Sequence, residues 1–238
     1  MFFSSVYTKD SSMTFDKGLR EYLVLVYKNM GLALIVSALV SYIIGSSPVL
    51  LKMLFGNPII SLLLVFSPLI VSIYFSSTLW SASMEKSRNL FFTFAVLMGA
   101  SLSTIFIVYT RTSIFQTFLT TAGTFGVMSL YGYRTKKDLS SLNSFLTMGL
   151  VGVLIASLLN MFFRSPAGTF LISIAGVIIF TLFTAYDVQK IKKTYDYVGV
   201  NSDMANKVAL IGALNLYLDF VNIFTYLLRF IGNVNNRD

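Results

Sequence analysis

Long apolar runs separated by short polar segments dominate the pattern of this chain. Each run has at least about 20 residues, the length that a helix needs to cross the hydrocarbon core of a bilayer. The roughly 10-residue alternating segments of a membrane β-barrel are absent. We therefore predict an all-α membrane protein with seven transmembrane helices, at 22–45, 58–80, 89–110, 113–133, 142–163, 167–189 and 206–231.

The same pattern sets the expected domain organisation. Residues 1–21 are predicted to form a cytoplasmic N-terminal tail, 22–231 the seven-helix transmembrane domain, and 232–238 a short C-terminal tail. The first apolar run follows a polar start without a small-residue cleavage site, so we expect a mature helix rather than a signal peptide.

Composition agrees with lipid as the main solvent. Hydrophobic residues make up 55% of the 238 positions and charged residues only 12%, against about 25% charged in a typical soluble domain. The chain contains no cysteine and no histidine, which excludes internal disulfides, Cys/His metal sites and Ser-His-Asp triads. Proton chemistry near neutral pH must then rest on carboxylates or lysines.

Basic residues gather in alternate loops. The formal net charge is +8, and most of the 18 Lys and Arg residues fall in the N-terminal tail and in the loops after the second, fourth and sixth runs. This asymmetry is the positive-inside signal of membrane proteins. It predicts a cytoplasmic N-terminus and, after seven crossings, an outside C-terminus. The charge needs no nucleic-acid partner, and the expected partner is the bilayer itself.

Two of the ten acidic residues lie inside the predicted helices. Asp187 is near the cytoplasmic end of the sixth helix, and Asp219 is in the middle of the seventh. A charge in hydrocarbon is costly unless it is paired, protonated or hydrated, so an acid at this depth indicates a functional site. Asn215, Asn222 and Tyr226 share a helix face with Asp219 and support a polar stripe that faces protein or water. The alternative is that the stripe joins helices by hydrogen bonds.

The two carboxyls are expected at similar depth, since the sixth and seventh helices are antiparallel neighbours. If they meet, they cannot both be ionised, and they share one proton. When the proton is lost at neutral pH, the two carboxylates repel each other and we expect the pathway to open. At lower pH they share the proton and we expect it to close. The same oxygens are ligands that calcium prefers, which makes Asp187 and Asp219 candidate metal ligands. Lys190 is one turn after Asp187 and is a candidate salt-bridge partner.

Three stretches carry a resemblance to a known family: AGTFGVMSLYGYRTKKDLS at 122–140, TAYDVQKIK at 184–192 and ALNLYLDFVNIFTYLLRFIG at 213–232. They resemble the bacterial members of the Bax inhibitor family, the transmembrane Bax-inhibitor-motif proteins. The resemblance implies two three-helix layers around a central seventh helix in the cell inner membrane. It also implies a pH-sensitive calcium leak gated by Asp187 and Asp219, with calcium as the transported ion and no cofactor. Some bacterial members pair the first aspartate with an arginine on the second helix, but Ser81 stands at that position here.

Two other functions stay open at this point. Bacterial members of the family are also tied to membrane-protease regulation, so the chain could be a non-transporting interaction protein that modulates a membrane protease or a cell-death partner. Tyr186-Asp187 also resembles one element of presenilin-like intramembrane proteases. Their second element has glycines before the acid, whereas Leu216-Tyr217-Leu218 precede Asp219. We therefore expect a channel or transporter rather than an enzyme.

Overall fold

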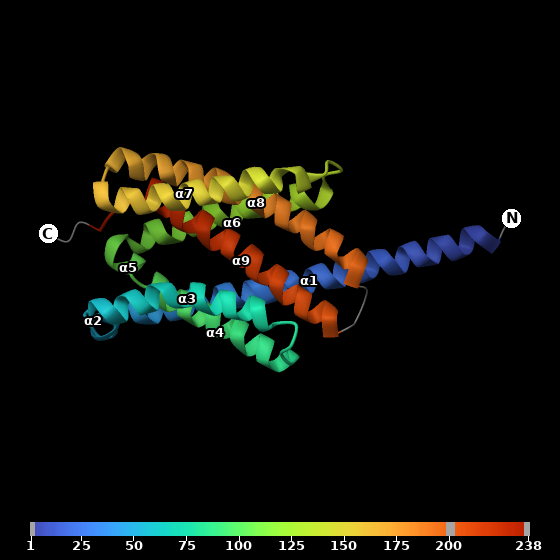
Figure 1. Cartoon of the computed structure of the whole chain (residues 1–238), viewed down its shortest axis with the longest axis horizontal. Helices are drawn as coiled ribbons and strands as arrows, with labels where there is room; N and C mark the ends of the chain where they lie inside the picture. The colour runs from blue at the N-terminus through green and yellow to red at the C-terminus, as the bar shows by residue number, and fades with distance from the viewer. Residues whose placement is uncertain (1–2, 199–202, 236–238) are drawn as a thin grey trace.

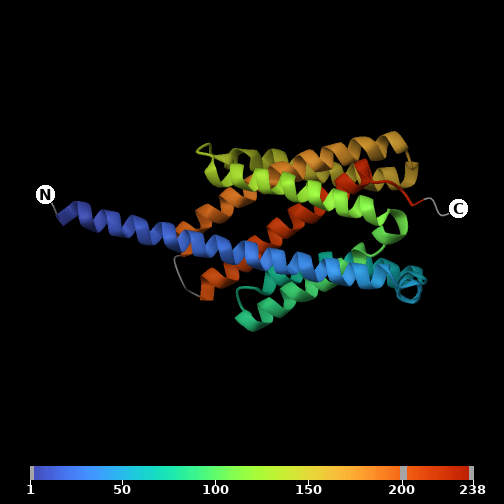
Figure 2. The same cartoon turned by 180° about the vertical axis from the view of Figure 1, so that it is seen from behind.

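The computed structural model describes residues 3–198 and 203–235, and this part of the chain is almost entirely helical. Figures 1 and 2 show long helices running roughly side by side from one end of the molecule to the other. The helices are α1 (Phe3–Gly45), α2 (Pro48–Phe55), α3 (Pro58–Thr78), α4 (Met84–Leu102), α5 (Ile105–Val108), α6 (Arg111–Arg134), the 3-10 helix η1 (Leu139–Leu142), α7 (Asn143–Phe163), α8 (Pro166–Val198) and α9 (Asp203–Ile231).

Six segments are long and apolar enough to cross a membrane: Lys17–Gly45, Pro58–Thr78, Met84–Val108, Leu139–Phe163, Pro166–Tyr197 and Asp203–Ile231. The predicted run 113–133 does form a helix, α6, of 24 residues. Threonine, serine, glutamine and glycine interrupt its apolar residues, so α6 is not among the six. The prediction of an all-α membrane protein is therefore confirmed. Of the seven predicted crossing helices, six have the length and hydropathy that a crossing requires.

Helix boundaries differ from the prediction at the N-terminal end. Residues 3–21, predicted as part of a tail, continue α1 without a break, since no proline interrupts the segment. Figure 2 shows α1 projecting well beyond the other helices at this end. The membrane-length segment of α1 is Lys17–Gly45. Residues 1–2 and 236–238 of the two predicted tails lie outside the described part.

The link between the first two predicted runs carries local structure that the apolar pattern did not predict. The link between the first two runs contains α2, which begins with Pro48 after the cap residue Ser47. Asn57 caps α3 in the same way, because its Oδ1 accepts a hydrogen bond from the backbone N–H of Ile59 at 2.9 Å. Proline suits the first position of a helix, where no N–H is needed. The Ser-Pro and Asn-Pro pairs therefore fix where these helices begin.

The predicted third run, 89–110, is broken into α4 and α5. Ser103 stands at the break, where its hydroxyl donates to the carbonyl oxygen of Ala100 at 2.7 Å. The segment after α5 then pairs with the end of the chain. Tyr109 and Val234 form an isolated β-bridge, and the Asn235 N–H donates to the carbonyl of Val108 at 2.8 Å. The described part of the predicted C-terminal tail is thus attached to the start of α6.

Helix α9 is the most enclosed of the six membrane-length segments. Of its apolar window, 67% is buried, against 33% or less for the other five. It packs against α1 and α4 on one side and against α6 and α8 on the other. Figure 1 shows α9 crossing between these two groups of helices. Helices α3 and α7, which pack chiefly on α4 and α8, expose large apolar side chains outward, as lipid contact requires.

A buried hydrogen-bond network joins α1, α4 and α9. The Ser37 hydroxyl donates to the carbonyl oxygen of Ala95 at 2.7 Å. Its oxygen also lies 2.7 Å from the hydroxyl of Tyr217. Because the Ser37 proton is already used, Tyr217 is the donor in this second bond. Gly99 lies at the same contact, and a Cβ built there would stand 2.5 Å from the backbone oxygen of Ser37. Only glycine therefore lets α4 approach α1 this closely.

The first prediction follows from this contact. Gly99→Ala should lower the free energy of unfolding by about 1–3 kcal/mol, because the added methyl group forces the backbones of α1 and α4 apart. Gly152→Ala is the matched control, since a Cβ at that exposed position on α7 has nothing within 4 Å. Thermal unfolding of both variants in detergent measures the difference. Equal midpoints for the two would contradict the close approach at Gly99.

Candidate functional site

The two membrane aspartates predicted from the sequence face one cavity of about 280 Å³. It lies between α7, α8 and α9, with apolar walls from α7 and α8 and a polar stripe from α9. The lining residues are Leu150, Leu154, Phe180, Phe183, Asp187, Asn215, Leu218, Asp219, Asn222 and Tyr226. The structure therefore brings together Asp187, Asp219 and the three supporting residues of the stripe.

Both carboxyl groups are buried. Asp187 is 8% exposed and Asp219 only 4%. The Oδ2 atom of Asp219 is fully buried, and no described residue gives it a hydrogen bond. The two groups lie close enough for their charges to interact. Ionising both carboxyls here costs free energy, because neither charge is hydrated and the two charges repel each other.

The stripe on α9 does not act as a hydrogen-bonded joint between helices. The Asn222 amide donates to the carbonyl of Leu218, in its own helix, at 2.8 Å. Among the described residues, the side chains of Asn215 and Asp219 make no hydrogen bond to another helix, which disfavours the alternative interpretation of the stripe. Tyr226 instead packs by its ring, which stacks on Phe180 with centroids 5.9 Å apart.

No cation within ion-pair distance balances Asp187 in the part of the chain that the structure describes. Lys190, the candidate partner, is exposed, and its ammonium lies 5.8 Å from the ring centroid of Tyr186. Its charge acts on Asp187 only at longer range. Helix α3 contains neither arginine nor lysine, and Ser81 lies in the turn beyond it.

A hydrogen-bonded clamp just beyond Asp187 was not predicted from the sequence. Gln189 Oε1 accepts a hydrogen bond from the Leu139 backbone N–H at 2.8 Å, and its Nε2 donates to the Lys137 carbonyl at 2.8 Å. One turn later, Lys193 forms an ion pair with Asp138 at 2.6 Å. These bonds tie α8 to the loop between α6 and α7. In the sequence, only the polar Gln189 beside the membrane acid Asp187 indicated these bonds.

The ion pair of this clamp is insensitive to mild acid. The hydrogen bond from Lys193 holds the pKa of Asp138 well below its usual range. A carboxyl with a lowered pKa stabilises the fold above its ordinary pKa and loses that contribution only as pH falls through the lowered value. A pH response near neutrality therefore does not arise from this pair.

Helix α6 closes on the same stretch of α8. A Cβ at Gly132 would overlap the backbone oxygen of Ala185, two residues before Asp187. The Lys192 ammonium donates to the Tyr133 carbonyl at 3.3 Å and lies 5.0 Å from the centroid of the Tyr133 ring. The helix segment that carries Asp187 is thus held on two sides.

Comparison with known proteins assigns the family. A model of the family described as inhibitor of apoptosis-promoting Bax1 matches residues 19–236, which is nearly the whole chain. The chain belongs to the Bax inhibitor family. This confirms the resemblance seen in the three sequence stretches, and both aspartates lie within the matched range.

Relatives of this Bax inhibitor family protein occur in several bacteria. The inner membrane protein YbhL of Escherichia coli K12 is 40% identical over 226 residues, covering 94% of this chain and 96% of YbhL. An uncharacterised protein of Rickettsia prowazekii is 39% identical over 226 residues, covering 95% of each chain. One of Borreliella burgdorferi is 43% identical over 218 residues, covering 91% of this chain and 93% of the relative. Together with its apolar helices, these matches identify an integral membrane protein.

The second prediction tests the clamp. Gln189→Leu leaves the Leu139 N–H and the Lys137 carbonyl without partners, which costs about 1–3 kcal/mol for each buried group. The loop between α6 and α7 should then open more often, and trypsin should cut it faster after Lys136 and Lys137. The control is Gln116→Leu, an equal change at an exposed position on α6. If both variants are cut at the wild-type rate, Gln189 does not hold this loop.

Proposed function

We propose that this Bax inhibitor family protein is a passive, pH-sensitive calcium leak, with Asp187 and Asp219 as its sensor and gate. The observation that supports the proposal best is the shared cavity, in which two buried carboxyls interact while one of them has an oxygen without a partner. An unpartnered acid at this depth in a membrane protein is unfavourable for stability alone, so a transport or sensing role explains it better.

The sign of the pH response follows from the pair. When one proton is shared between the carboxyls, they attract, and α8 and α9 stay together. When the proton is lost, two negative charges repel across the cavity, and the helices separate. Lower pH therefore closes the pathway and neutral pH opens it. Because the ion pair at Asp138 stays charged in both states, the cytoplasmic clamp does not reverse this sign.

The cavity also suits a divalent cation in transit. Calcium prefers hard oxygen ligands such as carboxylates and amide carbonyls. Asp187 of α8 lines the same space as the polar stripe of α9, which contributes Asp219, Asn215 and Asn222. Within the described residues, no third acidic side chain, cysteine or histidine completes a metal site with the two aspartates. A site with few ligands binds calcium weakly and releases it, which a leak requires.

The proposal includes seven crossings in two three-helix layers around α9, with α6 as the seventh span. Figures 1 and 2 support this arrangement, since α1 begins at one end of the bundle and α9 ends at the other. The basic segments before α4, after α6 and at the end of α8 lie at the end where α1 begins. By the positive-inside rule this end is cytoplasmic. The location that we propose is a bacterial inner membrane.

The third prediction concerns flux. Calcium entry into liposomes that hold the purified protein should be faster at neutral than at mildly acidic pH. Asp219→Asn removes the repulsion, so its flux at neutral pH should fall to the wild-type acidic level, and Asp187→Asn should act in the same way. Asp196→Asn, an exposed acid on α8 outside the cavity, is the matched control and should keep the wild-type pH response.

Three other results would count against the leak. If the calcium flux of Asp219→Asn and of Asp187→Asn kept the wild-type pH dependence, the aspartate pair would not be the gate. No flux from the wild type, together with a stable complex with a membrane protease, would favour the interaction protein. Peptide cleavage that Asp219→Ala abolishes would favour an intramembrane protease.

The fourth prediction concerns orientation. Because the chain has no cysteine, single cysteines can be introduced without a background. Ser46→Cys, in the turn before α2, should react with a membrane-impermeant thiol reagent in intact cells. Ser141→Cys, in η1, should react only after the cells are permeabilised. Both serines are exposed, so the comparison reports sidedness. The opposite pattern would reverse the proposed topology.

A further inference from the structure

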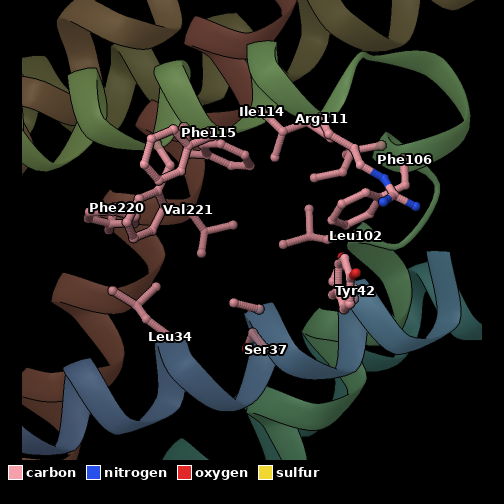
Figure 3. Close-up of a pocket in the computed structure, with 15 residues that line it drawn as sticks. Leu34, Ser37, Tyr42, Leu102, Phe106, Arg111, Ile114, Phe115, Phe220 and Val221 are labelled. Carbon is pink, nitrogen blue, oxygen red and sulfur yellow. The ribbon is translucent and has the colours of Figure 1, made fainter. Parts of the chain in front are cut away.

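A second cavity, of about 440 Å³, lies on the opposite face of α9 from the aspartates. It is bounded by α1, by the end of α4 with α5, by α6 and by α9. Figure 3 shows Leu34, Leu102, Phe106, Phe115 and Phe220 pointing into it. Its size is that of small-molecule sites, but its walls are almost wholly apolar. An ion pathway would need polar walls, so this cavity suits a hydrocarbon chain.

A single charged side chain stands at the rim of the cavity. Arg111 begins α6, and Figure 3 shows it beside Tyr42 at one end of the space. Its guanidinium lies 5.8 Å from the centroid of the Tyr42 ring. The segments that surround it, 22–84, 86–137 and 220–235, contain no acidic residue. Within residues 3–198 and 203–235, Arg111 forms no ion pair with a carboxylate, and its guanidinium can bind an anion at the end of the bundle.

Ser41 supplies an independent polar observation. It lines the cavity, is 4% exposed, and its buried hydroxyl has no hydrogen-bond partner among the residues that the structure describes. A buried hydroxyl without a partner is costly. Water gains little in so apolar a space, since it needs two to four polar partners. A ligand that brings one carbonyl oxygen to Ser41 and is otherwise apolar would satisfy this hydroxyl.

We propose that the cavity binds one anionic phospholipid from the bilayer. One acyl chain fills the apolar space, an ester carbonyl accepts a hydrogen bond from Ser41, and the phosphate binds Arg111. Tyr42 and Arg111 then form the amphipathic rim typical of a membrane interface. The lipid contacts α1 of one helix group and α6 of the other, so it fills the gap between the groups beside α9. This inference does not depend on the proposed calcium leak.

Lipid binding to the full chain in detergent tests the proposal. Phosphatidylglycerol and phosphatidylcholine with the same acyl chains serve as probes, and native mass spectrometry counts the bound molecules. The wild type should retain one phosphatidylglycerol more tightly than phosphatidylcholine. Arg111→Gln should weaken phosphatidylglycerol binding about fivefold, the effect of one interfacial cation, and leave phosphatidylcholine binding unchanged. Arg164→Gln, an exposed arginine at the same end but outside the cavity, should bind as the wild type does.

A cavity-filling variant separates the site from general surface attraction. Ala38→Phe places a ring in the space from an exposed helix position that lines it, so it should abolish tight binding of both lipids. Thermal unfolding of the same variant without lipid checks that it is folded. Retention of the lipid by folded Ala38→Phe, an equal loss in Arg111→Gln and Arg164→Gln, or equal wild-type affinity for both lipids would each overturn the proposal.

Discussion

The enclosure of α9 is the constraint on which the rest of the structure depends. This helix carries Asp219 and two asparagines that hydrocarbon cannot solvate, so protein must surround it on every side. The neighbours meet this demand by close backbone approach. Gly99 brings α4 against α1, where Ser37 reaches Tyr217 of α9, and a Cβ at Gly176 of α8 would overlap the ring of Tyr226. The small residues of the neighbouring helices are therefore conditions for burying the acid.

The two faces of α9 have opposite chemistry. One face presents the carboxyl and amide groups of the polar stripe to α7 and α8, and the other presents Phe220, Val221 and Phe224 to α1 and α6. Each face borders a cavity, so α9 has empty space beside it on both sides although it is the most buried of the membrane-length segments. A helix with space on two faces can shift between its neighbours at lower cost than one packed tightly all round. The proposed ion pathway and the proposed lipid site would both use the space that lies beside α9.

Much of this arrangement could be predicted from the sequence because lipid imposes simple rules. Apolar length identified the helices, and the scarcity of charge made Asp187 and Asp219 conspicuous. The features that were missed depend on local caps or on tertiary contacts. Ser47 and Asn57 begin helices through their caps, the break at Ser103 follows a single side-chain bond, and the clamp at Gln189 joins residues about 50 positions apart. Hydropathy carries no information about such bonds. Apolar length also predicted 113–133 as a crossing helix, whereas the polar residues of α6 keep it out of the six membrane-length segments.

The clamp bears on the proposed response of the buried acid pair to protons, which would operate without a histidine. A sensor needs one element that moves and one that stays in place while the charge changes. Asp187 lies between Ala185, which packs against Gly132, and Gln189, which holds the loop before α7. Both contacts are independent of pH, and the ion pair at Asp138 stays charged through mild acid because the pKa of that carboxyl is lowered. Repulsion inside the cavity must therefore act mainly on α9, whose opposite face borders a cavity, rather than on the clamped end of α8.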